Sequence, residues 1–385
     1  MSASTENWAG RIVLMVAHCA GMVDLVALPV WVGTLISEYK FDPQHAGALA
    51  TLFLLGAVVS SLYFAARFNR VPARLAAASG FAIAALAFVC AAFTSDFVAL
   101  AVLHAIAGAA AGCGLSFTHG TIGRALNPHR LFAIVGMALG VFAIVFLGAT
   151  PNLVAAFGGA TLFKVFGGVM ALAAVASAIA FPTAPVREAD HLLEDVSHLR
   201  PAVWFGVAGV SCMALTQAMM FSFVQRIGID RGFGTDAVTG VLIALGFVNL
   251  FPAPLAAIFE KRLLANVVLL AGPIVQVALA VTLSISGGFL AYAAPTVFFA
   301  AVMIFTHTFA FGVLSKLDPS SRALAATPAM LMVSAAIGPI LGGTLVQAFG
   351  YGGLGVAALV IAIFAVGLFS RVHAPRPLMT APKRV

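Results

Sequence analysis

The stretch from His18 to Pro29, HCAGMVDLVALP, places a carboxylate inside an otherwise apolar run. A charged side chain at the centre of a membrane-spanning helix is costly, so such residues usually face a partner, a water-filled cavity or a substrate. Burial also favours the protonated form of a carboxylate over its ionised form. Asp24 is therefore a candidate for binding a proton or a substrate. His18 lies six residues earlier, which is about 600° around a helix, so the two side chains are not expected to pair.

Other polar residues interrupt apolar runs later in the chain, and each offers a group that can titrate or form hydrogen bonds. They are His104, Thr216, Gln217, Asn249, Gln276, Thr306 and His307. An imidazole changes its charge near neutral pH, so His104 and His307 join Asp24 as candidates for proton coupling. The alternative is that each histidine is neutral and satisfied by a hydrogen bond in the core. Gln276 is expected to be structural, and His119 is expected near the cytoplasmic surface.

The elements that carry these residues are membrane spans. Of the 385 residues, 62% are hydrophobic and only 9% are charged, against a charged share of about 25% in soluble domains. A span needs about 20 apolar residues. Breaks at charged, Gly and Pro clusters predict twelve of them, at 11–37, 45–66, 72–94, 97–123, 130–150, 161–182, 202–225, 236–258, 263–286, 289–314, 322–349 and 351–370. The four cysteines stand singly and indicate neither a disulfide framework nor a zinc site.

The distribution of Lys and Arg predicts the orientation. With a cytoplasmic N-terminus, sixteen of the twenty lie on the cytoplasmic side and four (Lys40, Lys164, Arg226 and Arg231) on the other. This is the bias of cytoplasmic loops in membrane proteins. We therefore expect a multi-pass protein of a bacterial-type cytoplasmic membrane with both termini in the cytoplasm. The net charge of +7 follows from this topology, and nucleic acid is excluded as a partner.

One polar stretch, APVREADHLLEDVSHLR at 184–200, divides the chain almost equally. It predicts a cytoplasmic linker between an N-terminal bundle of six spans, 1–183, and a C-terminal bundle of six spans, 201–385.

Three segments carry motifs. The loop after the second span reads AARFNRVPARL (65–75), span 4 contains LAVLHAIAGAAAG (100–112), and span 11 contains SAAIGPILGG (334–343). Together with the twelve spans and the linker, they make essentially the whole chain resemble the major facilitator superfamily. The resemblance implies an all-α membrane fold in which two pseudo-symmetric six-helix bundles surround a central cavity.

The first segment stands where this family has motif A, GxLaDrxGrkxxl. Arg67 and Arg70 match basic positions, while Asn69 replaces a glycine and Ala66 the aspartate. The resemblance implies a conformational latch here and in the equivalent loop of the second half, IFEKRLLANV (258–267). The alternative is that these residues only anchor loops on the cytoplasmic side. The latch residues expected in the two loops are Arg67, Arg70, Arg74, Glu260 and Lys261.

Span 4 is similar to motif B, lxxxRxxqGxgaa, with His104 in place of the family's arginine. Gly108 and Gly112, four residues apart, allow close helix packing. Span 11 fits motif C, gxxxGPxxGG, and implies a bendable gating helix at Gly338, Pro339, Gly342 and Gly343. Antiporter members carry motif C in span 5, where this chain has only GMALG (136–140), so the direction of transport stays open.

In this family spans 1, 4, 7 and 10 line the cavity. The resemblance therefore implies a substrate site formed by Asp24, Thr216, Gln217, Phe221, Asn249, Thr306 and His307. No Lys or Arg is expected at mid-membrane depth, so cationic, neutral or amphipathic organic molecules are better suited than anions.

The expected function is secondary transport of a small organic molecule by a monomer, driven by a proton gradient without a cofactor, with a slight preference for export. Uptake by proton symport is the close alternative. A second alternative is copper import, because His18 with Met22 and Met303 with His307 are each four residues apart and combine imidazole with thioether. No metal site is otherwise expected. An enzyme is not expected, since GxSxG, HExxH and paired intramembrane aspartates are all missing from the sequence.

Overall fold

The computed structural model describes residues 4–5, 7–65, 67–182, 201–260, 262–285, 287–317 and 322–372, without the side chains of 65, 69, 129 and 322–331. The expected linker at 184–200, the Ala66 position and Lys261 lie outside these residues. So do the side chain of Asn69 and both ends of the chain.

Within the described residues, twelve helical segments are long and apolar enough to cross a membrane. This confirms the twelve predicted spans. The first half contains α1 (Trp8–Gly21), α2 (Val23–Ser37), α3 (Pro43–Ala65), the short 3₁₀ helix η1 (Phe68–Arg70), α4 (Ala73–Ala91), α5 (Phe97–Gly123), α6 (Pro128–Phe157) and α7 (Ala160–Ala180). The second contains α8 (Pro201–Asp230), α9 (Thr235–Val248), α10 (Pro252–Phe259), α11 (Ala265–Ile285), α12 (Phe289–Leu317), α13 (Arg322–Phe349) and α14 (Tyr351–Phe369).

Two of the spans are discontinuous, which the sequence did not predict. The first span consists of α1 and α2, separated at Met22, and the eighth consists of α9 and α10, separated at Asn249–Phe251. Both breaks coincide with a polar residue that the sequence singled out, Asp24 in the first span and Asn249 in the eighth.

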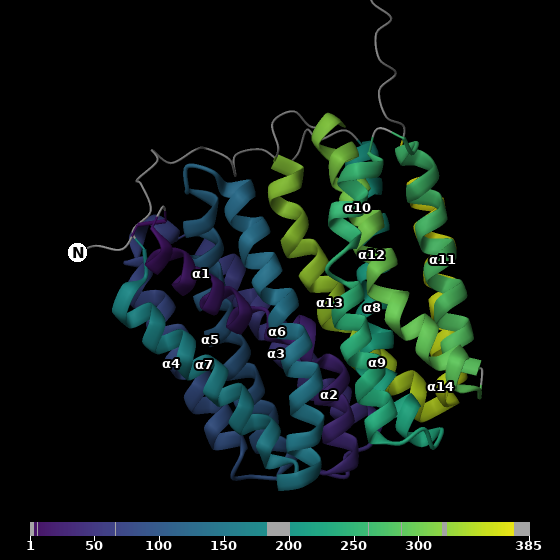
Figure 1. The fold of residues 1–385 in the computed structure, drawn as a ribbon, viewed down its shortest axis with the longest axis horizontal. Coiled ribbons are helices and arrows are strands. Elements are labelled where there is room, and N and C mark those ends of the chain that lie inside the picture. Colours follow the sequence, from purple (N-terminus) through teal and green to yellow (C-terminus); the bar gives the residue numbers. More distant parts are fainter. Residues whose placement is uncertain are drawn as a thin grey trace, which may run out of the picture.

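The helices form two bundles, α1 to α7 and α8 to α14, as the purple-to-teal and green-to-yellow halves of Figure 1 show. We call the side of the membrane on which α7 ends and α8 begins the linker side, and the opposite side the far side. The linker side is at the top of Figure 1, where α1 lies above α2 and α10 above α9.

An aromatic cluster fills the core of the first bundle. Trp31 of α2 packs edge-on against Phe53 of α3 and Phe166 of α7, with ring centroids 5.1 and 4.7 Å away. Gly108 and Gly112 of α5 lie directly against the backbone of α3 at Phe53 and Ala57. The close packing predicted for these two glycines is therefore confirmed, and it brings span 4 into the aromatic core.

The two bundles meet towards the far side. Extensive contacts between described parts of the two halves join α2 to α8, α3 to α13 and α6 to α9. In the second of these, the Ile340 N–H donates to Oγ1 of Thr51 at 3.1 Å. The linker-side piece of the first span, α1, packs instead on α5, α6 and α7 of its own half. The structure is thus closed between the halves on the far side.

Candidate functional site

Asp24 lies at the break in the first span. Met22 leaves the helical conformation with φ −107° and ψ 20°, and Asp24 is the second residue of the helix that starts after it. The backbone N–H groups of Asp24 and Leu25 lie next to its carboxylate. The start of a helix carries partial positive charge, which stabilises a carboxylate. The break therefore gives this residue a favourable position that an uninterrupted helix would lack.

The Asp24 side chain is half-buried, between the buried Val23 and Val26. Leu25 beside it is 49% exposed. Within the described residues the carboxylate has no side-chain partner. It is thus free to interact with a proton, a water molecule or a ligand.

Gln217 of α8 lies at a similar depth on the opposite half. α2 and α8 run in the same direction and meet where Gly33 abuts the Gln225 side chain. Asp24 is nine residues before Gly33 and Gln217 is eight before Gln225, which correspond to about 13 and 12 Å of helix. Oε1 of Gln217 is buried without a hydrogen-bond partner in the described part of the chain. The two residues therefore lie at a similar depth in the two halves, and that they form one substrate site stays a prediction.

His307 also keeps a free group. Its Nδ1 lies 3.1 Å from the Met303 carbonyl, to which it donates, and its ring packs on Phe311 at 5.0 Å. The side chain is half-buried, and the described residues provide no partner for Nε2. The adjacent Thr306 points elsewhere: it is 1% exposed and packs against Gly272 of α11. Thr306 is therefore a packing residue in this structure.

The structure corrects the placement of His104. The side chain is fully buried in the aromatic core, with Nδ1 at 2.6 Å from the Leu100 carbonyl oxygen and Nε2 at 3.2 Å from the Trp31 indole nitrogen. A carbonyl only accepts and an indole N–H only donates, so Nδ1 carries the hydrogen and Nε2 the lone pair. Both nitrogens of a neutral ring are thus used. His104 does not face the same surface as Asp24, because α5 turns it towards the interior of its own bundle.

Three other expected substrate residues are placed differently from one another. Thr216 is 3% exposed and donates to the Cys212 carbonyl of its own helix. Phe221 is buried against Phe299, with ring centroids 6.0 Å apart. Asn249 is half-buried at the break in span 8, and its Oδ1 is a buried acceptor without a partner in the described residues. Of these three, only Asn249 has a free polar atom.

His18 and His119 form a contact that the sequence did not predict. Nδ1 of His18 lies 3.0 Å from Nε2 of His119, joining α1 to α5. The prediction that His18 does not pair with Asp24 is consistent with this contact. The expected position of His119 near the cytoplasmic surface stays a prediction: it lies four residues before the linker-side end of α5, where its ring packs between His18 and Phe132. The sequence shows two histidines in different predicted spans, 101 residues apart, and nothing else in it indicates that they meet.

Two of the basic residues expected to form a latch, Arg67 and Arg74, contact groups of their own half. Arg67 donates to the Tyr63 carbonyl and lies 3.7 Å from that ring. Arg74 donates to the Ala178 carbonyl at the end of α7, and Arg70 is exposed. In the second half Glu260 lies 4.0 Å from Lys316. Among the described residues of the two linker-side loops, no hydrogen bond or ion pair joins one loop to the other.

The motif-C segment of α13 lies at the contact between the halves. Gly338 abuts the α8 backbone at Ala218 and Met219, and Gly342 abuts Met219 and Phe223. On the other side, Gly343 abuts the carbonyl of Pro43, and the carbonyl of Pro339 abuts Gly47. A side chain at either glycine would overlap these carbonyls. The segment therefore lies where the halves must separate if the far side opens.

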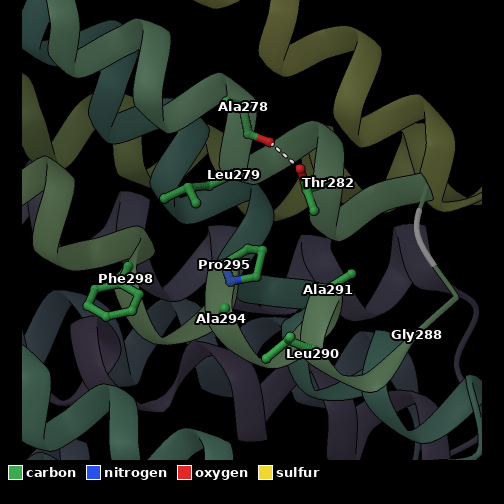
Figure 2. Close-up of a pocket in the computed structure, with 9 residues that line it drawn as sticks. All are labelled: Ala278, Leu279, Thr282, Gly288, Leu290, Ala291, Ala294, Pro295 and Phe298. Atoms are coloured by element: carbon green, nitrogen blue, oxygen red, sulfur yellow. Dashed lines mark hydrogen bonds between the residues drawn. The ribbon is translucent and has the colours of Figure 1, made fainter.

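The expected site is distinct from a groove on the protein surface. That groove, of about 560 Å³, is lined by residues of α11 and α12 of the second half and by Gly288 just before α12 (Figure 2). Its lining is mostly apolar, and the Thr282 hydroxyl donates to the Ala278 carbonyl at 2.8 Å. None of the expected site residues lines it.

The sequence matches the family model of the Major Facilitator Superfamily over residues 13–326. The chain belongs to this superfamily. No curated protein sequence matches it. As a member of the superfamily, the chain is a multi-pass integral membrane transporter of a small molecule, with the fold expected from its sequence.

Solved structures share the superfamily fold at low sequence identity. A bacterial homologue of the human lysosomal transporter Spinster, in an inward-facing and unoccupied conformation, superposes with a TM-score of 0.74 at 15% identity, covering 96% of this chain and 97% of its own. The same homologue in an inward-facing and occupied conformation has a TM-score of 0.71 at 15% sequence identity, covering 94% of this chain and 95% of its own. A D323A mutant of the nucleoside transporter NupG has a TM-score of 0.74 at 13% sequence identity, covering 94% of this chain and 97% of its own.

Proposed function

We propose that this superfamily member is a proton-coupled transporter in which Asp24 binds the coupled proton. The observation that carries the proposal is the position of Asp24: a carboxylate at a helix break, half-buried, without a side-chain partner in the described residues. A carboxylate in such a site changes its protonation when its hydration changes. His307, whose Nε2 has no partner in the described residues, is the second candidate for coupling.

Alternating access accounts for the arrangement of the two halves. Transporters of this fold move the halves against each other around a central site. The excess of Lys and Arg on the linker side favours that side as cytoplasmic. Closure on the far side then corresponds to a state open to the cytoplasm, and the inward-facing Spinster homologue of similar fold supports this assignment. We propose a monomer in a bacterial-type cytoplasmic membrane.

The substrate proposed is a small cationic, neutral or amphipathic organic molecule. Asp24, Gln217, Asn249 and His307 offer acceptors and one titratable ring, whereas Lys164 and Arg226 lie near far-side helix ends. An anionic substrate would need a cation near the acceptors. A cationic substrate and a proton would compete for the single Asp24 carboxylate, and such competition favours exchange of the substrate for protons. We therefore slightly prefer export, with uptake by proton symport as the alternative.

Transport into proteoliposomes tests the proposal. Compounds that raise the unfolding temperature of the purified protein are assayed with and without a pH gradient, in wild type and Asp24→Asn. Proton-driven movement of the compound against its own gradient, absent in Asp24→Asn, is expected. Extrusion driven by inward protons supports export and excludes symport, whereas accumulation in the direction of the protons supports symport. Identical gradient-driven transport by Asp24→Asn would eliminate Asp24 as the coupling residue.

Copper import receives no support from a specific contact. Nδ1 of His18 is bound to His119 and that of His307 to the Met303 carbonyl. Lower copper accumulation by the Met22→Leu and Met303→Leu variants than by wild type would support copper import.

A further inference from the structure

A small polar cavity lies between the two halves on the far side. Its volume is about 160 Å³, smaller than the roughly 300–1,000 Å³ of sites for drug-sized ligands. It is lined by the ends of α2 and α6 of the first half and by α8 and the start of α9 of the second. Its position near the far-side ends of these helices separates it from Asp24, at the opposite end of α2.

Polar groups without protein partners face this cavity. Oε1 of Gln225 is buried without a hydrogen-bond partner in the described residues. The hydroxyls of Thr34, Ser37 and Thr235 line the cavity and make no hydrogen bond within the described part of the chain, and the Glu38 carboxylate has no ion pair there. A group of unpartnered oxygen atoms of this kind requires hydrogen-bond donors from water or from a ligand.

The electrostatics of the cavity favour a cation. Thr34 and Ser37 belong to the last turn of α2, Val154 and Ala155 to that of α6, and Ile229 to that of α8. The C-terminal end of a helix carries partial negative charge. Three such ends therefore converge on one cavity, together with the Glu38 carboxylate, and only Thr235 comes from the start of a helix.

The nearby basic side chains already have partners. Arg226 contacts Asp230 through Nε at 3.0 Å and through Nη2 at 2.6 Å. Lys40, which does not line the cavity, donates to the Ser37 carbonyl. Neither cation is paired with Glu38 in the described residues, so the Glu38 carboxylate is available to a ligand.

We propose that this cavity binds a small organic ammonium ion between the halves, with Glu38 providing the counter-charge and Gln225 accepting a hydrogen bond. Because both halves contribute to the cavity, it is assembled only when the far side is closed. A ligand that binds one of two states stabilises that state. The ammonium ion therefore holds the far side closed and slows the conformational cycle, independently of the central substrate site.

Three probes of similar size and different charge test the charge preference: n-propylammonium, n-propanol and propionate, at constant ionic strength. Propylammonium is expected to raise the unfolding temperature of the purified protein saturably, and the neutral and anionic probes are not. Glu38→Gln and Gln225→Leu should remove the shift. Asp236→Asn, which changes an exposed far-side carboxylate outside the lining, should keep it. Lys40→Gln should strengthen it.

A thiol reporter tests the effect on conformation. Thr51→Cys, in a background without the four native cysteines, places a thiol at a 6% exposed position between the halves. At a concentration equal to its Kd, propylammonium halves the ratio of open to closed far side, so labelling should slow about twofold. Equal effects of all three probes, no effect of any, or an unchanged shift in Glu38→Gln would overturn the proposal. A shift without slower labelling would refute the conformational part.

Discussion

The Trp31 indole N–H donates to Nε2 of His104 across 3.2 Å, and this hydrogen bond ties the far-side piece of the first span to span 4. Both residues are fully buried. His104→Phe should leave the indole N–H unsatisfied and cost about 1–3 kcal/mol of stability. Denaturation of wild type, His104→Phe, Trp31→Phe and the double variant measures this as a coupling energy. Strictly additive effects of the two substitutions would show that the hydrogen bond does not stabilise the fold.

A side chain at Gly47 should open the far side. A Cβ there would overlap the Pro339 carbonyl, so Gly47→Ala must separate α3 from α13. Labelling of Thr51→Cys is expected to become faster. Gly136→Ala is the matched control, because a Cβ at Gly136 meets nothing within 4 Å. Equal labelling rates in the two variants would contradict the assignment of this contact as the far-side closure.

Asp42 caps α3 at its far-side start. Its Oδ1 accepts from the His45 N–H at 2.8 Å. Burial acts to raise the pKa of Asp42, but the backbone and ring of His45 outweigh it and hold the pKa below its usual value. A carboxyl group whose pKa is lower in the folded protein than in the unfolded chain stabilises the fold. This stabilisation is complete above the pKa of the unfolded chain, about 4, and is lost as the pH falls through the pKa of the folded protein.

Replacing this cap should lower stability at neutral pH. Asp42→Ala is expected to cost about 1 kcal/mol at pH 7 and much less below the folded pKa, where the wild-type carboxyl is already protonated. Unfolding temperatures of both proteins across this pH range check it, with Asp236→Ala for comparison. An undiminished difference at low pH would show that the ionised carboxylate is not the capping group.

The spans and the close packing at small residues could be predicted from the sequence. Apolar length determines how many helices cross a membrane, and glycines four residues apart, as at Gly108 and Gly112, permit close packing wherever a partner helix lies. The GP segment of span 11 was predicted as a gating element, and it does lie between the halves at Gly343 and Pro43. That it acts as a gate stays a prediction.

The side-chain partners inside the membrane could not be predicted in the same way. The break at Met22 lies inside one continuous apolar run, which hydropathy cannot divide. His104 meets a tryptophan 73 residues earlier, and His18 a histidine 101 residues later. These partners depend on how the helices rotate about their axes, and a nearly uniform apolar surface leaves that rotation unspecified. Asp24 could be selected from the sequence as a candidate because the free-energy cost of a carboxylate in an apolar run does not depend on which helices surround it.

Proton release on ligand binding tests the central role of Asp24 most directly. A compound that stabilises the purified protein is added to weakly buffered wild type, Asp24→Asn and Asp236→Asn, and a pH indicator records the protons released. For export by exchange, we predict release of up to about one proton per protein from wild type and Asp236→Asn, and none from Asp24→Asn although it still folds. Equal release from Asp24→Asn would contradict the assignment of Asp24 as the coupled proton site.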